Sequence, residues 1–501
     1  MRQINIDVQN VAGPMNRFYQ FCVGGGRAYE TLVAENQRHL KMVHDDCGFQ
    51  YVRFHGLLHD DMAVYSEDAA GNPHYNFQYI DLLYDYILSI GMRPLVELSF
   101  MPQALASGGQ TIFFWRGNVT MPKSLKKWSG LIEALLRHWT ERYGEDEVKT
   151  WPIEVWNEPN LDGFFASKQP FKDYMLLYEA AAKAIKKVSP SYLVGGPATA
   201  GCAWITEMVD ACAEKGLPLD FISTHTYGVD GFVDEFGTQA LKMCPDEKSI
   251  TKDVKRVAEA VRNSKMPDLP VYFTEWSSSY SPRDPVHDSY HQASFLLTRL
   301  KDSWGSVAAM SYWVFSDIFE EAGPGPQPFH GGFGLINISG IKKPSFFAYK
   351  MLNELGNIQI VCDDQRTIAA KDDSGVQVLF WDYTVPAQEK RSDQQYFIRD
   401  LPPRSTDPAE IEFTGLKAGR YELTLYGVGY RMNDAYTFYH DLKGGRSDAN
   451  LSRTEYDYLQ NRCSGAPVQE QIVSVGQDGK FIFQRDMREN DVYLLVLKRL
   501  I

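Results

Sequence analysis

The sequence predicts an α/β fold: a (β/α)8 TIM barrel followed by a C-terminal β-sandwich. Between about residues 15 and 350, short apolar runs alternate with longer segments of helical periodicity. After about residue 355, short alternating runs separated by Pro and Gly turns are typical of an antiparallel sandwich. An open doubly wound sheet is the alternative, but Gly24, Gly25 and Gly26 lack the GxGxxG spacing of a nucleotide-binding turn.

Eight mainly apolar runs are the expected barrel strands, and longer helical segments lie between them. The strands are expected at Phe18–Phe21, Tyr51–Phe54, Arg93–Leu98, Ile153–Trp156, Leu193–Gly196, Phe221–Ser223, Val271–Thr274 and Met310–Val314. The helices are expected at Thr31–Val43, Phe77–Ile90, Leu125–Tyr143, Phe171–Val188, Ala203–Lys215, Ile250–Asn263 and Ser289–Lys301. Gly91 after the second helix is a common terminating residue.

The C-terminal part reads as short strands with turns between them. Strands are expected at Gly375–Tyr383, Ile411–Phe413, Arg420–Tyr426, Lys480–Gln484 and Asp491–Leu497, with a helical excursion within Tyr430–Arg462. The segment Gln3–Val8 also alternates, although it precedes the barrel, and we expect it to pair with the sandwich. The predicted organisation is residues 1–13 as a strand joining the sandwich, 14–350 as the catalytic barrel and 351–501 as the accessory sandwich.

Composition and charge narrow the class of protein. The 501 residues are 44% hydrophobic and 23% charged, which is ordinary for a globular protein, and the net charge of −13 disfavours nucleic acid as a partner. There is no apolar run of about 18 residues that would indicate a membrane span. The polar start lacks the pattern of a signal peptide, and the seven scattered cysteines include no CxxC pair. We therefore expect a cytoplasmic protein with reduced thiols, although the sequence leaves open whether a leader has been removed.

Two glutamates stand where strands end. The run WPIEVWNEPN places Glu158 directly before Pro159, which has no N–H for a sheet ladder, so Glu158 is expected where a strand opens into a loop. Glu275 stands in the same setting within VYFTEW. In a barrel the carboxyl ends of the strands carry the chemistry, and a pair of carboxylates suits cleavage of a glycosidic bond. Glu158 and Glu275 are therefore the candidate catalytic residues.

Other polar and aromatic residues are expected at the same face of the barrel. Asn157 can hydrogen-bond a sugar hydroxyl, Trp313 can present a flat face to a sugar ring, and His225 and Tyr227 can orient a carboxylate. The candidate binding residues are His55, Asn157, His225, Tyr227, Trp313, Glu320, Glu321 and Phe114. The cluster of His55, His59 and Asp60 could mimic a metal site, but it lies on one loop without a helix to fix ligand geometry. We expect no metal and no cofactor, since two carboxylates suffice.

Four segments together resemble glycoside hydrolase family 39, the β-xylosidase and α-L-iduronidase family of clan A. They are VRFHGLLHDDMAVY at 52–65, EVWNEPNL at 154–161, FISTHTYG at 221–228, and YWVFSDIFEE at 312–321 with HGGFGLI at 330–336. The resemblance implies that Glu158 is the general acid/base and Glu275 the nucleophile of a retaining double displacement. It also implies a sugar pocket lined by the binding residues named above, and it allows a homo-oligomer.

The residues favour a neutral sugar over a uronic acid. A sugar carboxylate wants Arg or Lys, whereas the loop after the eighth strand offers Glu320 and Glu321, and Arg283 is the one nearby cation in the loop after the seventh strand. An unbranched pentose fits a pocket crowded by aromatics such as Phe113 and Phe114, which would also close one end and make the action exo. The predicted function is release of β-D-xylose from the non-reducing end of xylo-oligosaccharides, in xylan degradation. The alternatives are another glycone (α-L-arabinopyranoside, β-galactoside or α-L-iduronide) and a non-catalytic sugar-binding barrel. The predicted partner is a small oligosaccharide or glycoside, without nucleic acid or membrane.

Overall fold

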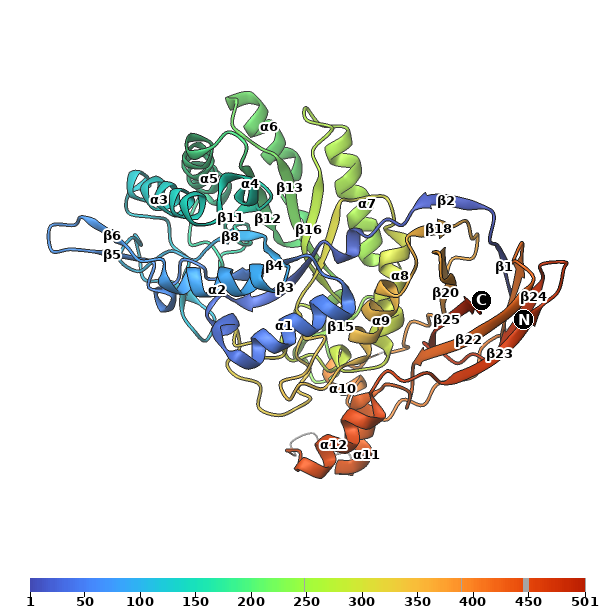
Figure 1. The fold of residues 1–501 in the computed structure, drawn as a ribbon. Helices are drawn as coiled ribbons and strands as arrows, with labels where there is room; N and C mark the ends of the chain where they lie inside the picture. The colour runs from blue at the N-terminus through green and yellow to red at the C-terminus, as the bar shows by residue number, and fades with distance from the viewer. Residues whose placement is uncertain (247, 389, 445–449, 501) are drawn as a thin grey trace.

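A parallel barrel forms the larger part of the molecule (Figure 1). The computed structural model describes residues 1–246, 248–388, 390–444 and 450–500. The sheet has the strand order β7 (Arg93–Pro94), β4 (Tyr51–His55), β3 (Cys22–Arg27), β17 (Ala309–Tyr312), β16 (Val271–Ser277), β13 (Phe221–Tyr227), β12 (Leu193–Thr199), β11 (Pro152–Val155) and β8 (Val96–Leu98). β7 and β8 flank Leu95, whose N–H donates to Val52 O at 2.9 Å, and β8 also pairs with β11. The two short strands therefore occupy one position and close a ring of eight.

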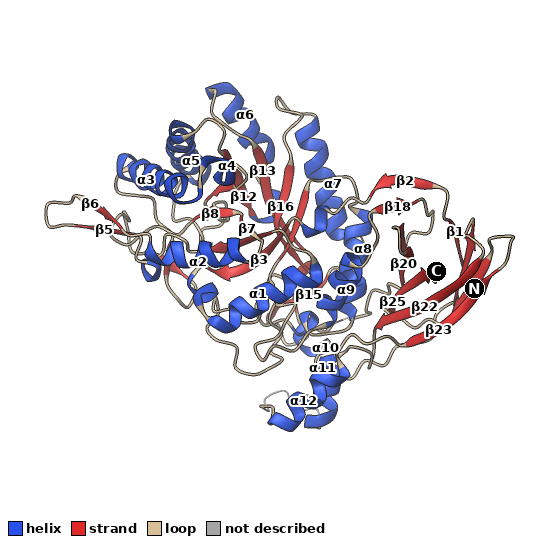
Figure 2. Ribbon diagram, viewed as in Figure 1, coloured by secondary structure: helices blue, strands red, loops and turns tan. Residues whose placement is uncertain are grey.

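Helices surround the strands (Figure 2). The helix that follows each strand position is, in chain order, α1 (Ala34–Cys47), α2 (Gln78–Ser89), α3 (Leu125–Tyr143), α5 (Pro170–Val188), α6 (Ile205–Lys215), α7 (Ser249–Arg262), α8 (His291–Asp302) and α9 (Pro344–Asn353). Ser124 begins α3 by accepting the Lys127 N–H, and Gly48 ends α1 at φ 78°. The short helix α4 (Glu145–Val148) precedes β11. The predicted (β/α)8 class is confirmed.

The first strand is the one misplaced barrel strand. The prediction at 18–21 is wrong: Phe18–Gln20 form a 3-10 helix, and β3 begins at Cys22. β3 contains three consecutive glycines, which have low strand propensity and hide it from a pattern search. The barrel needs them, because a Cβ on Gly24 would overlap the Trp313 ring.

The second part of the chain contains two further sheets. A seven-stranded sheet runs β2 (Val11–Pro14), β18 (Ile358–Ile360), β19 (Thr367–Lys371), β20 (Gly375–Trp381), β25 (Val492–Arg499), β22 (Gly419–Val428) and β23 (Gln469–Val475). A three-stranded sheet runs β1 (Arg2–Asp7), β21 (Ala409–Thr414) and β24 (Phe481–Arg485). Side chains of both sheets, among them Ile4, Ile411, Phe380 and Leu495, form one apolar core. The predicted sandwich is confirmed, whereas β18, β19 and β23 had no predicted counterpart.

The N-terminal strand joins the sandwich as expected. β1 pairs in parallel with β21 over the register Arg2 to Ala409 through Asp7 to Thr414, and both chain ends lie at this side of the molecule (Figure 1). Whether the chain divides at residues 13 and 350 stays a prediction. The predicted helical excursion contains α11 (Ala435–Lys443) and α12 (Arg453–Arg462), and its residues 445–449 lie outside the described residues.

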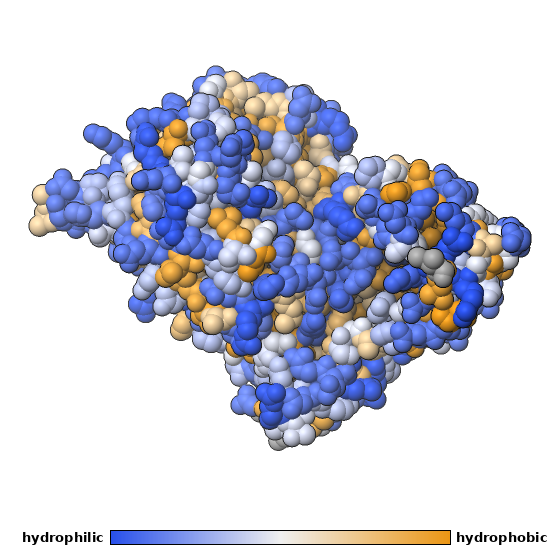
Figure 3. Space-filling view, viewed as in Figure 1, coloured by the Kyte–Doolittle hydropathy of each residue, from blue (hydrophilic) through white to orange (hydrophobic). Residues whose placement is uncertain are grey.

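Short hairpins and one short helix complete the described elements. They are β5 (Tyr65–Glu67) with β6 (Pro73–Tyr75), β9 (Thr111–Ile112) with β10 (Gly117–Asn118), β14 (Val229–Val233) with β15 (Gln239–Met243), and α10 (Asp393–Tyr396). Hydrophilic residues predominate on the face drawn in Figure 3, with apolar residues in small patches. No helix in the described part of the chain is both long and apolar enough to cross a bilayer.

Candidate active site

A cavity of about 700 Å³ opens at the carboxyl ends of the barrel strands. Its walls combine carboxylates, a histidine and aromatic rings, which is the mixture expected of a site that binds an uncharged polar ligand. It is lined by His55, Ile112, Phe113, Asn157, Glu158, Leu161, Phe164, Ala200, Gly201, Thr226, Tyr227, Val229, Asp253, Glu275, Tyr280, Pro282, Trp313, Glu321, Ala322 and Phe333. Both predicted catalytic residues and six of the eight predicted binding residues belong to the cavity or its direct contacts.

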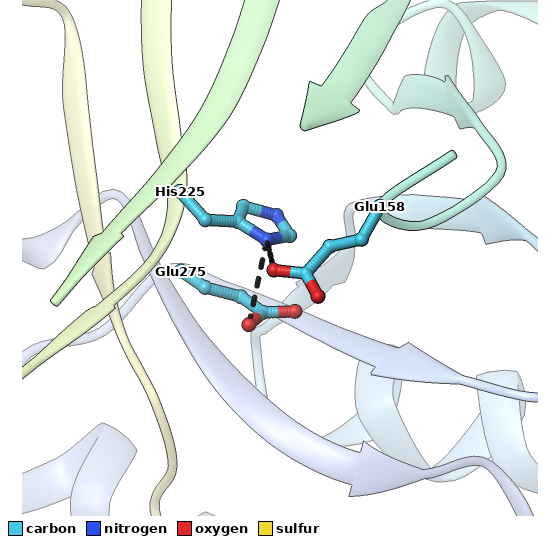
Figure 4. Close-up of side chains that lie close together, drawn as sticks. All are labelled: Glu158, His225 and Glu275. Carbon is cyan, nitrogen blue, oxygen red and sulfur yellow. Dashed lines mark hydrogen bonds and ion pairs between the residues drawn. The ribbon is translucent and has the colours of Figure 1, made fainter. Parts of the chain in front are cut away.

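Glu158 and Glu275 face each other across this cavity (Figure 4). Glu158 follows β11 and adopts φ 46°, a sparsely populated conformation, while its N–H donates to Ala198 O at 2.9 Å. Glu275 lies within β16. A carboxylate oxygen of Glu158 lies within 4.8 Å of one of Glu275. Retaining glycosidases have carboxyl groups about 5–5.5 Å apart and inverting ones about 6.5–9.5 Å, so the separation fits retention.

His225 connects the two carboxylates. Its Nδ1 lies 2.9 Å from Glu158 Oε1 and 3.5 Å from Glu275 Oε2, and its Nε2 lies 3.2 Å from the Thr274 hydroxyl. Complete burial lowers the pKa of His225 well below its usual value, and the charge of Arg53 lowers it further. The ring is therefore neutral. The Thr274 hydroxyl donates to Glu154 at 2.8 Å, so it accepts from the His225 Nε2–H. His225 Nδ1 accepts from a protonated Glu158.

The two carboxyl groups have different environments. Glu158 is 8% exposed, and burial raises its pKa well above the usual value, with the negative charge of Glu275 adding to the effect. A protonated Glu158 is available at neutral pH to give a proton to a leaving group. Glu275 instead accepts hydrogen bonds on both oxygens: Arg53 donates to Oε1 at 2.8 Å and Tyr227 to Oε2 at 2.7 Å. These bonds hold the Glu275 carboxylate in a fixed orientation at the cavity, as a nucleophile needs.

Beneath the cavity lies a buried ionic cluster that the sequence did not lead us to expect. The guanidinium of Arg53, in β4, contacts Glu97 at 2.7 Å, Glu154 at 2.6 Å and Glu275 at 2.8 Å, and it donates to Asn157 Oδ1 at 2.9 Å. The side chains of Arg53, Glu97 and Glu154 are fully buried. A charged residue inside an otherwise apolar strand, as in VELSF and PIEVW, was the available signal. The cluster fixes the strand-end residues from below.

His55 carries a second positive charge to the cavity. Its Nδ1 lies 2.8 Å from Glu97 Oε2, and its Nε2 lies 3.5 Å from Glu321 Oε1. Burial alone would lower the pKa of His55, but the neighbouring carboxylates of Glu97, Glu321 and Glu275 outweigh it and raise the pKa to about 10. The protonated ring packs against Trp313 with centroids 4.7 Å apart, and together they form one wall of the cavity.

Asn157 has an unused donor. Its Oδ1 accepts from Arg53, whereas its Nδ2 is buried without a hydrogen-bond partner among the described residues. Since Asn157 lines the cavity, a ligand oxygen would satisfy this group.

Two of the predicted binding residues, Glu320 and Phe114, neither line the cavity nor contact the two catalytic candidates, whereas His225 lies just outside the lining in contact with Glu158. Glu320 turns away and pairs with Arg27 at 2.6 Å, and Arg27 also contacts Asp61. Phe114 is 64% exposed on the outer surface, while the preceding Phe113, at φ 66°, takes the place at the cavity. The physical reason is local: the reversed φ of Phe113 changes which aromatic side chain points inward.

The cavity also contains residues that the sequence patterns did not single out. These are Thr226, Asp253, Tyr280, Val229, Leu161 and Phe333. Thr226 donates to Asp253 Oδ2 at 2.7 Å, which joins β13 to the first turns of α7. Leu161, Tyr280 and Phe333 lie in loops, where periodicity gives no signal.

The same arrangement could accept a cation. One ligand atom each from Glu158, His225 and Glu275 lie within 4.8 Å of one another. A Zn²⁺ ion bound there would occupy both carboxylates, so it would compete with acid–base chemistry rather than support it.

The comparisons with known proteins place the chain in a family. The model of the glycosyl hydrolases family 39 matches residues 2–399. The chain belongs to glycoside hydrolase family 39. A β-xylosidase of Geobacillus stearothermophilus is 41% identical over 399 residues, covering 78% of each chain. One from Caldicellulosiruptor saccharolyticus is 43% identical over 392 residues, covering 77% of this chain and 79% of that protein.

Solved structures agree with this family membership. The crystal structure of a monomeric β-xylosidase from Caulobacter crescentus CB15 has a TM-score of 0.96 and 42% identity, covering 100% of both chains. The protein is therefore a glycoside hydrolase, and its substrate is a sugar.

Proposed function

We propose that the protein is a retaining, exo-acting β-D-xylosidase that releases xylose from the non-reducing ends of xylo-oligosaccharides. The observation that carries the proposal is the pair Glu158 and Glu275, whose carboxylate oxygens approach within 4.8 Å while Glu158 has a raised pKa and Glu275 accepts a hydrogen bond from Arg53. The names of the two relatives at 41% and 43% identity support xylose as the sugar.

The proposed reaction has two displacement steps. A Glu275 oxygen attacks the anomeric carbon as the bond to the leaving oxygen breaks, and Glu158 gives that oxygen its proton. The product is a covalent xylosyl-enzyme. Glu158, now a carboxylate, takes a proton from water, and the resulting attack releases xylose and the Glu275 carboxylate. Two inversions at one carbon retain its configuration.

The charges in the cavity support a neutral sugar. The carboxylate of a uronic acid would lie beside Glu275 and Glu321, and the cationic His55 in the lining is already paired with Glu97 and Glu321, whereas hydroxyl groups donate hydrogen bonds to carboxylates. Arg283 directs its guanidinium to the carbonyl oxygens of Ala322 and Gly323, at 3.0 and 3.2 Å. A uronide is therefore the less favoured glycone.

The aromatic wall supports exo-action on a pentose. Phe113 and Phe164 meet edge to face with centroids 5.4 Å apart, and both line the cavity with Trp313. In the proposed binding mode these rings pack against the glycone and disfavour the hydroxymethyl group of a hexose or a further sugar at that end of the cavity. α-L-Arabinopyranosides remain the alternative glycone, since they are also pentoses.

The test is release of nitrophenol from nitrophenyl β-D-xylopyranoside, with α-L-arabinopyranoside, β-galactoside and α-L-iduronide compared in parallel. We expect the xyloside to have the highest kcat/KM, and Glu275→Ala to abolish turnover while leaving the circular dichroism spectrum unchanged. A higher kcat/KM for another glycoside would change the assigned sugar from xylose to that glycone. Full activity of Glu275→Ala would show that Glu275 is not the nucleophile. Product analysis on xylotetraose that shows cleavage in mid-chain would contradict exo-action.

We also propose a cytoplasmic location, supported by the seven cysteines, which are all free, as a reducing compartment would keep them.

A homo-oligomer is the alternative to the monomeric state described for the Caulobacter crescentus relative. Sedimentation velocity distinguishes the two states.

A further inference from the structure

One face of the β14–β15 hairpin extends outward from the catalytic cavity, and we call the residues on this face the strip. The register pairs Val229 with Met243, Gly231 with Leu241 and Val233 with Gln239, and directly paired residues share a face of a hairpin. Val229 lines the catalytic cavity. The same face therefore continues from the cavity to the pair of Val233 and Gln239, a distance of roughly 13 Å along the strand.

A second hollow of about 600 Å³ lies at the outer part of the hairpin and touches both the strip and the alternate pair of Phe232 and Ala240. It is lined by Gly231, Phe232, Val233, Gln239, Ala240, Leu241 and Tyr280. Tyr280 lines the catalytic cavity as well, and it is 54% exposed, so its ring stands at the junction of the two spaces. A Cβ added to Gly231 would meet no atom within 4 Å, so the surface over the strip is open.

The hairpin is anchored at its base. The Met243 N–H donates to Asp393 Oδ1 at 2.9 Å, and the Cys244 N–H donates to Gly228 O at 2.9 Å. Met243 itself is 2% exposed and belongs to the core that contains the barrel. The strip is therefore held at a defined position beside the cavity.

The arrangement of the site indicates which part of a substrate would reach the strip. His55 and Trp313, which form one cavity wall, come from β4 and β17, whereas Glu158 and the hairpin come from β11 and β13 on the other half of the ring. Glu158 protonates the leaving oxygen in the proposed reaction, so the leaving group lies on its side. A chain that leaves the cavity past Glu158 passes toward Val229 and Tyr280.

We infer that the strip formed by Val229, Gly231, Val233, Gln239 and Leu241, together with Tyr280, binds the distal sugars of the leaving group in longer β-linked xylo-oligosaccharides. This inference rests on the proposed function. The first leaving-group sugar occupies the cavity beside Glu158. The second and third lie on the strip, where Tyr280 and the bare Gly231 backbone offer flat surfaces to pyranose rings and Gln239 offers an amide to their hydroxyls.

The experiment measures kcat/KM for xylose release from xylobiose, xylotriose and xylotetraose. In the natural protein we expect a gain of about three- to tenfold from xylobiose to xylotetraose, the effect of one ring-stacking or apolar contact. Gly231→Trp fills the hollow without backbone strain, because Gly231 has no positive φ, and it should abolish the gain while leaving xylobiose within about twofold. Val233→Ser removes an exposed apolar side chain and should reduce the gain.

Asp230→Trp is the matched control, because it adds the same bulk to the same strand at a position that lines neither hollow, and it should preserve the gain. A flat chain-length profile in the natural protein, or an undiminished gain in both Gly231→Trp and Val233→Ser, would overturn the inference. Hydrolysis of nitrophenyl β-D-xylopyranoside separates the two proposals. If this aryl xyloside is not hydrolysed, the proposed function fails. If it is hydrolysed but kcat/KM does not rise with the length of the xylo-oligosaccharide, only the inferred subsite is contradicted.

Discussion

Replacing Arg53 by methionine should destabilise the barrel and slow catalysis together. Arg53 is fully buried and contacts three carboxylates and Asn157, so Arg53→Met leaves Glu97 and Glu154 buried without their cation. Glu97 retains His55 at 2.8 Å and Glu154 retains the Thr274 hydroxyl at 2.8 Å, so neither carboxylate loses every partner. Removing one partner of a buried pair costs about 3–5 kcal/mol, and we expect a loss of that size at pH 7.

The loss should depend on pH in a definite direction. Burial raises the pKa of Glu97, but the charges of Arg53 and His55 outweigh it and hold the pKa below its usual value. Glu97 therefore stabilises the fold above its unfolded pKa of about 4.3, and this contribution disappears as the pH falls through the folded pKa. In Arg53→Met the buried carboxylates bind protons more readily in the folded state. The difference between the two proteins should be small near pH 4 and largest at neutral pH.

Urea unfolding at several pH values, followed by tryptophan fluorescence, measures this difference. Arg137→Met is the matched control, since Arg137 is 57% exposed and pairs with Glu133 within α3, where about 0.3–0.5 kcal/mol is expected. Loss of the charge-assisted bond to Glu275 should also lower kcat/KM by about 10- to 100-fold. A destabilisation below about 1 kcal/mol at pH 7, or one that does not change with pH, would refute the reasoning.

Four further predictions concern the cavity. Glu158→Ala should lower kcat/KM on xylobiose by about 10²–10⁴-fold, because the leaving sugar needs a proton. The first step on a dinitrophenyl xyloside, whose leaving group needs no proton, should slow far less, and azide should restore turnover. Equal losses on both substrates would contradict the role of Glu158 as an acid. Because burial raises the pKa of Glu158 and the acid must be protonated, kcat/KM should fall on the alkaline side in the natural protein and lose that limb in Glu158→Ala. Tyr227→Phe removes the 2.7 Å bond to Glu275 and should lower kcat/KM by about 10- to 100-fold, measured with the aryl xyloside; an unchanged rate would show that the bond is dispensable. Zn²⁺ should inhibit competitively and EDTA should reverse the inhibition, whereas activation by Zn²⁺ would contradict the expectation of a metal-free reaction.

The parts of the fold that could be predicted are those where local chemistry agrees with the tertiary structure. Pro159 marks the end of β11, and alternation marks β1 and β20. β3 was missed because its glycines depend on a long-range contact. The Trp313 ring leaves no room for a Cβ at Gly24, and a local sequence pattern does not show this contact.

The same limit applies to the active site. The sequence predicted that Glu158 and Glu275 lie at strand ends, because the signals that end a strand are local in the sequence. Glu320 was misplaced because its partner, Arg27, lies on another strand, and a sequence does not show which carboxylate a cation will take. Long-range ion pairs decide such positions only after the barrel has closed.

The pairing of β1 with β21 has a consequence for synthesis of the chain. Arg2 is made before the barrel, yet its partner Ala409 follows about four hundred positions later. During translation the N-terminal strand therefore waits unpaired while the barrel segments emerge, and its sheet is completed only when β24 has also been made. A nascent chain that stops after the barrel would expose the apolar side chains of Ile4 and Ile6, which in the finished protein are fully buried.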